Sequence, residues 1–363
     1  MKKFKKVAAV LMTASLAAGL AGCGSSASNK EQAGNSDAVT ADAAASSETE
    51  TGASSVSEPI VLKYGATGWK NTEALLEAAG LDHYDGYTVE TTVFQGGNLC
   101  LEALAADQID FTGTSEIPPI AASLAENGGN FKIVLINSSS PQNQELVALK
   151  SSDFKSVADL KGKKVGYIKS TTAQYFLNEM LKQAGLSWND IDAVEVTTTD
   201  GVTALIGGDI DAFASYGNSI NAAKANGAVT LADAVSILSG NFPFEISETV
   251  LKDDAKVAAI ADYLARVQKA YEWAEDNLDK WAQISAEPTG STYEDTLDLL
   301  QRTYDDRGYL DDFIGIDDGV IASEQSVADS FYELGLLDQK VDASTFYDDS
   351  FYKVYEKALA NLK

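Results

Sequence analysis

Histidine and cysteine are scarce in this chain. Among 363 residues there is one histidine, His83, and there are two cysteines, Cys23 and Cys100. A single imidazole excludes metal sites and catalytic mechanisms that need several histidines. The sequence also lacks a zinc-ligand spacing, a Walker loop and a nucleophile-elbow motif. We therefore predict that the chain is not an enzyme and that it uses neither a metal nor another cofactor.

Basic residues are also few. The chain has 27 lysine and arginine residues against 54 aspartate and glutamate residues, which gives a formal net charge of −27 at pH 7. Such an excess of negative charge argues against binding to nucleic acid or to an anionic membrane surface. The acidic residues are spread along the chain, so most of them are expected on the solvated surface, as is His83.

Hydrophobic runs long enough for a transmembrane helix are missing. At the N-terminus, Val7–Leu20 is apolar but shorter than the roughly 20 residues that a bilayer span needs. Lysines precede this run at positions 2, 3, 5 and 6, and small residues follow it. That layout is typical of a secretory signal peptide. We predict a signal peptide over residues 1–22 and an extracytoplasmic location for the mature protein.

The predicted signal peptide ends at a cysteine. The segment Leu20-Ala21-Gly22-Cys23 resembles the lipobox of bacterial lipoproteins, in which cleavage precedes a cysteine that receives lipid. The resemblance implies lipidation of Cys23 and attachment to the cell membrane through this N-terminal lipid. Loss of residues 1–22 removes four lysines and brings the formal charge to −31. Cys100 then has no partner for an intrachain disulfide and is expected to be a small buried apolar side chain.

Large apolar side chains are almost absent from residues 23–58. A segment of this composition cannot bury enough surface to offset its ordering entropy, so we predict a flexible linker. The folded part is expected to begin near Pro59. It leaves about 305 residues, a size that favours two lobes over one core.

Strand-like and helix-like runs alternate through the first two-thirds of the folded part. Ile60–Gly65 and Lys164–Ile168 have the composition of strands. A helix is predicted after each, over residues 71–79 and 173–184, with Gly80 and Gly185 as stop signals. Alternation of this kind predicts an α/β fold in which each lobe has a mainly parallel sheet.

Two segments of the chain share a pattern. Ala103–Asp110 and Ala204–Asp211 both read A-L-x-x-x-x-I-D, and a phenylalanine follows each closely. Each is predicted to form a helix, a tight turn and a short strand, with one copy in each lobe. The last third differs, because apolar residues at helical spacing over Val257–Tyr271, and further patterns from Thr292 and Ser326, predict helices. We expect this helical segment to pack on the first lobe.

Polar loops follow several of the predicted strands. In a doubly wound sheet, ligands bind beyond the carboxyl ends of the strands. The loops over residues 67–71, 95–98, 113–119 and 169–173 combine hydroxyl or amide side chains with an expected helix N-terminus. Unpaired N–H groups and the helix dipole make such places suitable for a small oxyanion. Trp69, Tyr216 and Phe242 are predicted to wall the pocket.

Four phrases of the sequence resemble a known family. Asp110–Ile120 is similar to the D-F-G-x-T-G-D-x-P-P-I segment of aliphatic-sulfonate-binding proteins, which belong to the nitrate, sulfonate and taurine receptors of bacterial ABC importers. Phe154–Val165 resembles the entry to that group's second lobe, and Lys169–Ala173 resembles its K-G-S-S-A loop. Near the C-terminus, residues 335–342 also resemble the group's tail.

The resemblance implies a type 2 periplasmic-binding fold, in which two α/β lobes close on a ligand. Lobe 1 is expected over residues 59–147 and 248–363 and lobe 2 over residues 148–247, with crossings near 145–150 and 244–250. The resemblance also implies an ABC permease and its ATPase subunit as partners of a monomer, and a small organosulfonate, an alkanesulfonate or taurine, as ligand. It implies the following oxyanion ligands: Thr114, Ser115, Ser170, Thr171 and Thr172.

The chain departs from the family pattern at one expected pocket wall. Tyr216 and Asn218 stand where the group often has tryptophan and proline, which favours a more polar ligand than a simple alkanesulfonate. Glu116 stands where aspartate is usual, either to hold the ammonium of a zwitterion such as taurine or as a helix-start carboxylate without a ligand role. If the ligand is a cation, Glu116 or Glu245 becomes the anchor.

The complete predicted ligand-binding set is Trp69, Lys70, Gln95, Gly96, Gly97, Thr114, Ser115, Ser170, Thr171, Thr172, Tyr216 and Asn218. An anion site in a chain this acidic has to be locally positive, which we expect from helix ends together with Lys70 or Lys169. Two alternatives stay open. One is a receptor for a thiamine-pyrimidine-like or other aromatic ring stacked between Trp69 and Tyr216, and the other is an enzyme on the same fold.

Overall fold

The computed structural model describes residues 59–125 and 128–362. The predicted signal peptide, the predicted lipidation site Cys23 and the predicted linker over residues 23–58 lie outside the described residues.

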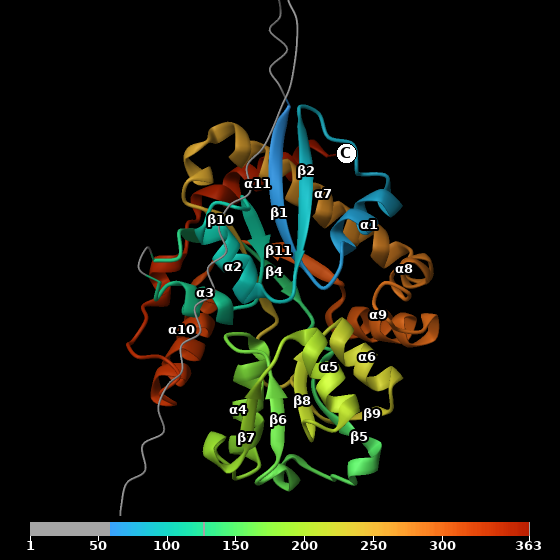
Figure 1. Cartoon of the computed structure of the whole chain (residues 1–363). Coiled ribbons are helices and arrows are strands. Elements are labelled where there is room, and N and C mark those ends of the chain that lie inside the picture. Colours follow the sequence, from blue (N-terminus) through green and yellow to red (C-terminus); the bar gives the residue numbers. More distant parts are fainter. Residues whose placement is uncertain (1–58, 126–127, 363) are drawn as a thin grey trace, which may run out of the picture. The chain divides into compact units, whose positions relative to one another are not determined.

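The described chain forms two separate β-sheets, one in each lobe (Figure 1). In spatial order the first sheet comprises β11 (Asp311–Ile314), β4 (Phe131–Ser139), β10 (Asn241–Ser247), β3 (Phe111–Gly113), β1 (Ile60–Thr67) and β2 (Tyr87–Phe94). The second sheet comprises β7 (Asp192–Glu195), β6 (Lys164–Tyr167), β8 (Ala212–Tyr216), β5 (Gln144–Leu149) and β9 (Ala228–Asp233). The predicted two-lobed α/β architecture is confirmed.

Most strands of each sheet run in one direction. In the first sheet β1 pairs in parallel with β2 and β3, whereas β10 is antiparallel to β3 and β4, and β11 is antiparallel to β4. In the second sheet β6 pairs in parallel with β7 and β8, and β5 is antiparallel to β8 and β9. The reversed strands β5 and β10 are the first strands after each passage between the lobes.

The two passages lie several residues before their expected positions. The chain leaves the first sheet after Ser139 and enters the second at Gln144; it leaves the second after Asp233 and returns at Asn241. The expected crossings near 145–150 and 244–250, and the lobe boundaries drawn from them, are therefore wrong. Both segments are core strands, because β5 forms its ladder with β8 and β9 and β10 forms its ladder with β3 and β4.

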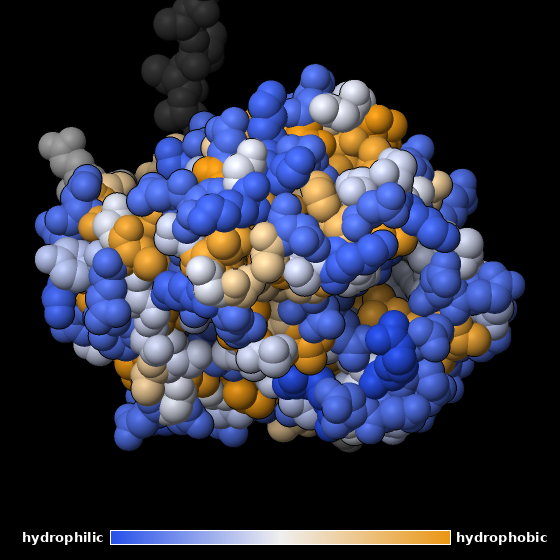
Figure 2. Space-filling view, turned by 90° about the horizontal axis from the view of Figure 1, so that it is seen from below, coloured by the Kyte–Doolittle hydropathy of each residue, from blue (hydrophilic) through white to orange (hydrophobic). Residues whose placement is uncertain are grey.

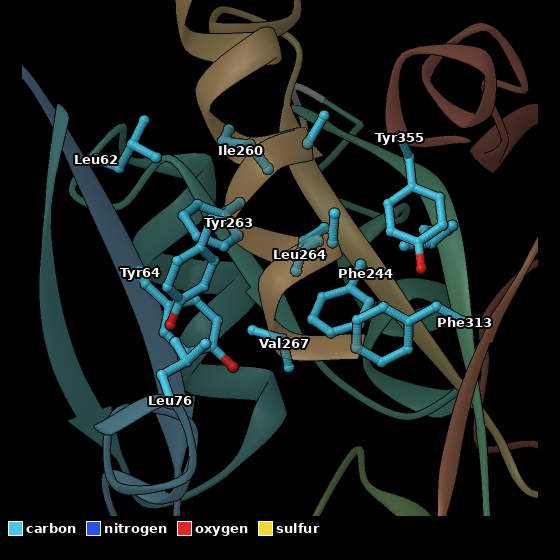
Figure 3. Packing of buried hydrophobic residues seen from close by; sticks show 14 of the residues in the cluster. Leu62, Tyr64, Leu76, Phe244, Ile260, Tyr263, Leu264, Val267, Phe313 and Tyr355 are labelled. Atoms are coloured by element: carbon cyan, nitrogen blue, oxygen red, sulfur yellow. The ribbon is translucent and has the colours of Figure 1, made fainter. Parts of the chain in front are cut away.

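The C-terminal segment is helical and packs on the first lobe, as expected. Its long helix α7 begins after Asp253, whose carboxylate accepts hydrogen bonds from the N–H groups of Ala255 and Lys256. The helices of lobe 1 are α1 (Asn71–Ala79), α2 (Gly97–Ala105), α3 (Ile117–Ala122), α7 (Asp254–Asp276), α8 (Leu278–Ser285), α9 (Tyr293–Arg307), α10 (Asp318–Glu333) and α11 (Ser350–Asn361). Figure 3 shows Ile260, Tyr263, Leu264 and Val267 of α7 at the centre of the lobe 1 core.

Lobe 2 has its own core and its own helices. Its buried side chains come from both faces of the second sheet and from α4 (Thr172–Gln183), α5 (Thr198–Gly207) and α6 (Asn218–Ala225). Short 3₁₀ helices occur at Lys150–Ser152, Val157–Leu160, Trp188–Asp190, Val250–Lys252 and Ala343–Phe346. The repeated sequence pattern falls on α2 and β3 in lobe 1 and on α5 and β8 in lobe 2, which confirms one copy in each lobe.

The surface of the described chain agrees with the predicted placements. His83 is exposed and Cys100 is fully buried, as expected. The face seen in Figure 2 is mostly hydrophilic, with hydrophobic residues scattered over it. Among the described residues, no helix combines the length and the apolar character needed to cross a bilayer.

Candidate ligand-binding cavity

A cavity of about 480 Å³ lies between the two lobes. Lobe 1 contributes the ends of β1, β3 and β4, the starts of β10, β11, α1 and α2, and one side of α7. Lobe 2 contributes the start of β5, the start of α4 and the end of β8. The volume falls within the range of roughly 300–1,000 Å³ that is usual for pockets that bind small molecules. The strand ends meet there, as the doubly wound topology requires.

Half of the predicted ligand-binding residues line this cavity. They are Gly97, Thr114, Ser115, Thr171, Thr172 and Tyr216. Phe242, which was predicted as a wall, lines it as well. These positions share a place in the fold, because each lies at a strand end or at the first turn of a helix that follows it.

Trp69, Gln95 and Asn218 lie outside this cavity, in an adjoining hollow between the lobes. The side-chain oxygen Oε1 of Gln95 accepts hydrogen bonds from the hydroxyls of Thr198 (2.7 Å) and Thr199 (3.0 Å) across the cleft. These three residues are therefore placed where the lobes touch.

The indole of Trp69 stacks on that of Trp281, with ring centroids 6.2 Å apart. Asn218 Nδ2 donates to the carbonyl of Pro288 at 3.3 Å. Trp69 and Tyr216 both line the adjoining hollow, and Trp281 occupies one face of the indole.

The predicted positive groups are also elsewhere. Lys70 is exposed and pairs with Glu73 at 3.2 Å, and Lys169 pairs with Glu195 at 3.4 Å. Ser170 lies outside the cavity lining, with a positive φ of 54°, and its N–H donates to Gln174 Oε1 at 2.8 Å. Among the described residues that line the cavity there is no lysine, arginine or histidine.

Helix N-termini supply the positive potential instead. Thr171 caps α4 and Thr172 is its first residue, while Gly217 precedes α6 and Gly97 begins α2. The N–H groups of a first helical turn lack intrahelical partners, and the helix dipole places partial positive charge there. Both lobes therefore present ends suited to an anion at the cavity.

Two glycines allow the close approach of these helix starts. A Cβ on Gly97 would lie 3.1 Å from Thr114 Cβ and 3.0 Å from Pro118 Cγ. A Cβ on Gly96, which lies just outside the cavity lining, would lie 3.2 Å from the hydroxyl of Tyr216. The absence of side chains at these positions lets α2 of lobe 1 meet Tyr216 of lobe 2.

The Tyr216 hydroxyl is a donor that faces the cavity. Its oxygen is buried and lies near the Thr171 side chain, without a hydrogen bond of good geometry to the described residues. Burial raises the pKa of Tyr216 to about 12, so the phenol keeps its proton at neutral pH. A buried donor without a partner costs free energy that a bound acceptor would recover.

The remaining wall is aromatic, and the sequence analysis missed it. It comprises Tyr64, Phe244, Tyr263, Tyr271 and Phe313. Figure 3 shows Tyr64 on one side of α7 and Phe244 and Phe313 on the other. The spacing of Tyr263 and Tyr271 is that of any core-facing helix, so the sequence carries no signal that separates these two residues from the core.

Glu116 is not in the cavity. Its carboxylate accepts hydrogen bonds from Ser239 Oγ (2.6 Å) and Asn241 Nδ2 (3.1 Å), and burial raises its pKa. Glu116 occupies the position before α3, so of the two expectations the helix-start carboxylate matches its place. The expected alternative, contact with the ammonium of a zwitterion, does not match, because Glu116 ties lobe 1 to the passage between the lobes.

Glu245 contacts Thr114 and lies outside the cavity lining. It is fully buried and accepts a hydrogen bond from the Thr114 hydroxyl, and its Oε2 has no partner among the described residues. Burial raises its pKa well above its ordinary value. Glu245 is absent from the cavity lining, which argues against it as the anchor for a cation.

One carboxylate does face the cavity, and the sequence analysis missed it. Asp311, at the start of β11, lines the cavity and accepts a hydrogen bond of 2.6 Å from Asn137 Nδ2. Burial raises its pKa to about 7. No sequence signal pointed to it, because β11 is a short strand within the helical third.

Two lobes that carry helix N-termini to a shared cavity define a ligand-binding protein with the type 2 periplasmic-binding fold. A family model described as NMT1/THI5 like matches residues 69–277. The chain belongs to this family.

Similar proteins include binding proteins for sulfonates. An Escherichia coli (strain K12) protein named as an aliphatic sulfonates-binding protein is 30% identical over 257 residues, which cover 69% of this chain and 76% of that protein. The crystal structure of the periplasmic aliphatic sulphonate binding protein from Escherichia coli matches with a TM-score of 0.66 at 25% identity, over 80% of this chain and 92% of that one.

The alkanesulfonate-binding protein from Xanthomonas axonopodis pv. citri bound to MOPS matches with a TM-score of 0.68 at 23% identity. The match covers 81% of this chain and 100% of that one, and it shows the shared fold.

Proposed function

We propose that this chain is the substrate-binding subunit of an ABC importer and that it captures a small organosulfonate between its lobes. The observation that carries the proposal is the cavity end formed by the starts of α2 and α4 together with the buried hydroxyl of Tyr216. A sulfonate offers three oxygens that only accept hydrogen bonds, and this end of the cavity offers donors from both lobes. The names of the similar proteins support the same ligand class.

The contacts between the lobes support a closing mechanism. Besides the bonds from Thr198 and Thr199 to Gln95, the ring of Tyr175 in α4 meets Phe331 in α10 edge-on, with centroids 5.7 Å apart. A ligand that bridges both lobes stabilises this arrangement by its differential affinity for the closed state. No bond is made or broken in this function.

The negative net charge does not oppose the proposal at short range. Charges on the surface are screened over about 10 Å at moderate salt. The helix ends act inside the cavity, where water is displaced and their potential is less screened. An extracytoplasmic location, lipidation at Cys23 and delivery to a permease with its ATPase subunit complete the proposal.

Calorimetry on a matched pair of variants tests this ligand class. The buried hydroxyl of Tyr216 belongs to the cavity lining. Tyr216→Phe removes this donor and is expected to weaken binding of ethanesulfonate or taurine tenfold or more, because one hydrogen bond to a charged group contributes roughly 1.5–3 kcal/mol. Tyr304→Phe, on the exposed side of α9, is the control and is expected to bind as the wild type does.

Equal affinities in the two variants would contradict the proposed oxyanion end. Binding of a thiamine-pyrimidine precursor by the wild type, with no binding of any sulfonate, would instead favour the aromatic-ring alternative.

A further inference from the structure

We propose that Asp311 and Asn137 form a subsite for a protonated amine, so that the receptor selects zwitterionic aminoalkanesulfonates over simple alkanesulfonates. The proposal rests on the proposed sulfonate function and adds a second recognition element to the same cavity. It assigns to Asp311 the binding of an ammonium group, which was one of the two alternatives for Glu116.

The position of Asp311 follows from strand pairing. Asp311 is the first residue of β11 and pairs with Ser139, the last residue of β4. Both residues line the cavity at the point where the chain leaves lobe 1. The carboxylate therefore lies on the wall that β4 and β11 form, whereas the helix starts that face an oxyanion belong to α2 and α4.

Asn137 complements the carboxylate. Its Nδ2 donates to Asp311 Oδ1 at 2.6 Å, which turns its Oδ1 away from that contact. This Oδ1 is buried and accepts no hydrogen bond from the described residues, and Asn137 also lines the cavity. A carboxylate and a free amide oxygen side by side only accept hydrogen bonds. An ammonium group, which only donates them, matches this pair.

The neighbouring cation does not neutralise this carboxylate. The guanidinium of Arg307 donates to Ser138 Oγ (2.7 Å) and Tyr309 Oη (2.8 Å), and it lies over the ring of Tyr309. Burial of Asp311 outweighs the favourable effects of the Asn137 and Ser139 side chains and of Arg307, and the pKa of the carboxyl is raised to about 7. Ionising it in the empty cavity is costly, and a bound ammonium would supply the missing opposite charge.

Aromatic rings lie on the same wall. Tyr271 and Phe313 line the cavity with centroids 6.3 Å apart, and the charge of Asp311 raises the pKa of Tyr271 further. Ring faces attract an alkylammonium group, most strongly when water is displaced. The cavity volume of about 480 Å³ leaves room for an anionic end and a cationic end joined by a short chain.

Isothermal titration with two isosteric ligands tests this selectivity. Taurine and 1-propanesulfonate differ by an ammonium group in place of a methyl group. The wild type is expected to bind taurine at least tenfold more tightly than 1-propanesulfonate. Asp311→Asn is expected to reduce this ratio to about one, mainly by weakening taurine binding.

Asp312→Asn is the matched control. Asp312 follows Asp311 in β11, so its side chain points to the opposite face of the strand. This variant is expected to keep the wild-type ratio.

Each contrary outcome points to a different failure. If the wild type binds the two ligands with equal affinity, the amine subsite is overturned and the sulfonate function is left intact. This measurement uses the wild-type protein alone. Equal weakening of both ligands by Asp311→Asn would overturn it as well. Binding of n-propylammonium with no binding of either sulfonate would overturn the proposed function itself.

Discussion

Lys63 and Asp110 exchange two hydrogen bonds across lobe 1. The Lys63 N–H donates to Asp110 Oδ2 at 2.8 Å, and the Asp110 N–H donates to the Lys63 carbonyl at 2.8 Å. Lys164 and Asp211 repeat both bonds in lobe 2, at 2.9 and 2.8 Å. The two pairs end the repeated sequence pattern and have the same separation of 47 residues. The two lobes therefore share the same local hydrogen-bond arrangement between a lysine backbone and an aspartate.

The two copies are expected to differ in their contribution to stability. Asp110 is buried and also pairs with Lys256 at 2.8 Å, whereas Asp211 is only half-buried. Asp110→Ala is expected to lower the free energy of unfolding by about 1.5–3 kcal/mol, the range for hydrogen bonds to a charged group. Asp211→Ala is expected to lower the free energy of unfolding by a smaller amount. Asp209→Ala, at an exposed position, is expected to have the smallest effect. Urea denaturation measures all three, and an equal or larger cost at Asp211 would refute this ranking.

Gly97 is expected to support ligand binding because a side chain at this position would crowd Thr114 and Pro118. In Gly97→Ala the new Cβ would lie 3.0–3.1 Å from Pro118 and Thr114, so the start of α2 has to shift by a few tenths of an ångström away from Thr114 and α3. We expect sulfonate affinity to fall about tenfold, which corresponds to about 1.4 kcal/mol. Gly207→Ala is the control, because its nearest neighbour, Asp209 Oδ2, is 3.6 Å from the added Cβ. This substitution within α5 is expected to leave sulfonate affinity unchanged. Calorimetry measures both variants, and equal affinities of Gly97→Ala and Gly207→Ala would contradict the prediction.

The contact between Gln95 and α5 is expected to favour lobe closure. Gln95→Ala removes the acceptor of the Thr198 and Thr199 hydroxyls, which are on the other side of the cleft. Ligand affinity should fall several-fold, while the melting temperature of the ligand-free protein stays within a few degrees. Exposed Gln108→Ala should change neither quantity. Small-angle scattering with and without ligand reports closure, and unchanged affinity in Gln95→Ala would show that this contact contributes nothing.

Glu324 is expected to make the protein less stable at alkaline pH. It is fully buried, and burial raises its pKa to about 8, although it accepts a hydrogen bond from Tyr347. The folded state therefore holds this proton more tightly than the unfolded state does. Its contribution to stability is present below pH 4.5 and is lost as the pH rises through 8, by up to about 1.4 kcal/mol per pH unit.

Urea denaturation at pH 5 and pH 8 tests this sign. Glu324→Gln is expected to lose less stability than the wild type between the two values. Glu333→Gln, exposed at the end of the same helix, is expected to behave like the wild type. Parallel pH profiles of the wild type and Glu324→Gln would show that Glu324 is not protonated in the folded state.

Taurine affinity is expected to rise with pH. The pKa of Asp311 is about 7 without ligand, so below that value the carboxyl is neutral and cannot pair with an ammonium group. Affinity should increase about tenfold between pH 6 and pH 8 by proton linkage. Glu275, Arg307 and Tyr271 also face Asp311, so Asp311→Asn identifies the group that titrates. A pH profile that persists in this variant would assign the effect to another group.

Local signals predicted helix starts that lie at the cavity. Thr171, Thr172 and Gly97 belong to short turns whose residue types indicate the start of a helix, and all three line the cavity. The mistaken placements have a different cause. Lys70 and Ser170 belong to the same kinds of turn, but the direction of each side chain depends on neighbours that the local sequence does not reveal.

Long-range contacts explain what the sequence analysis missed. Asp311 meets Asn137 across 174 residues of chain, and Tyr263 enters the cavity from a helix whose spacing is that of an ordinary core helix. The passages between the lobes were misplaced for a similar reason, since Gln144–Leu149 has the apolar composition of a core strand and of a connecting strand alike. Pairing partners, rather than composition, decide which of the two it becomes.

The most direct test of the central claim is a thermal-shift screen of the chain from residue 23 onward, unfolded and refolded to remove bound ligand. The panel contains taurine, 1-propanesulfonate, sulfate, nitrate, a thiamine-pyrimidine precursor and n-propylammonium. The account predicts a marked rise in melting temperature with the sulfonates, largest with taurine, because a ligand that prefers the folded state stabilises it. A rise with the pyrimidine or the amine and none with any sulfonate would contradict it.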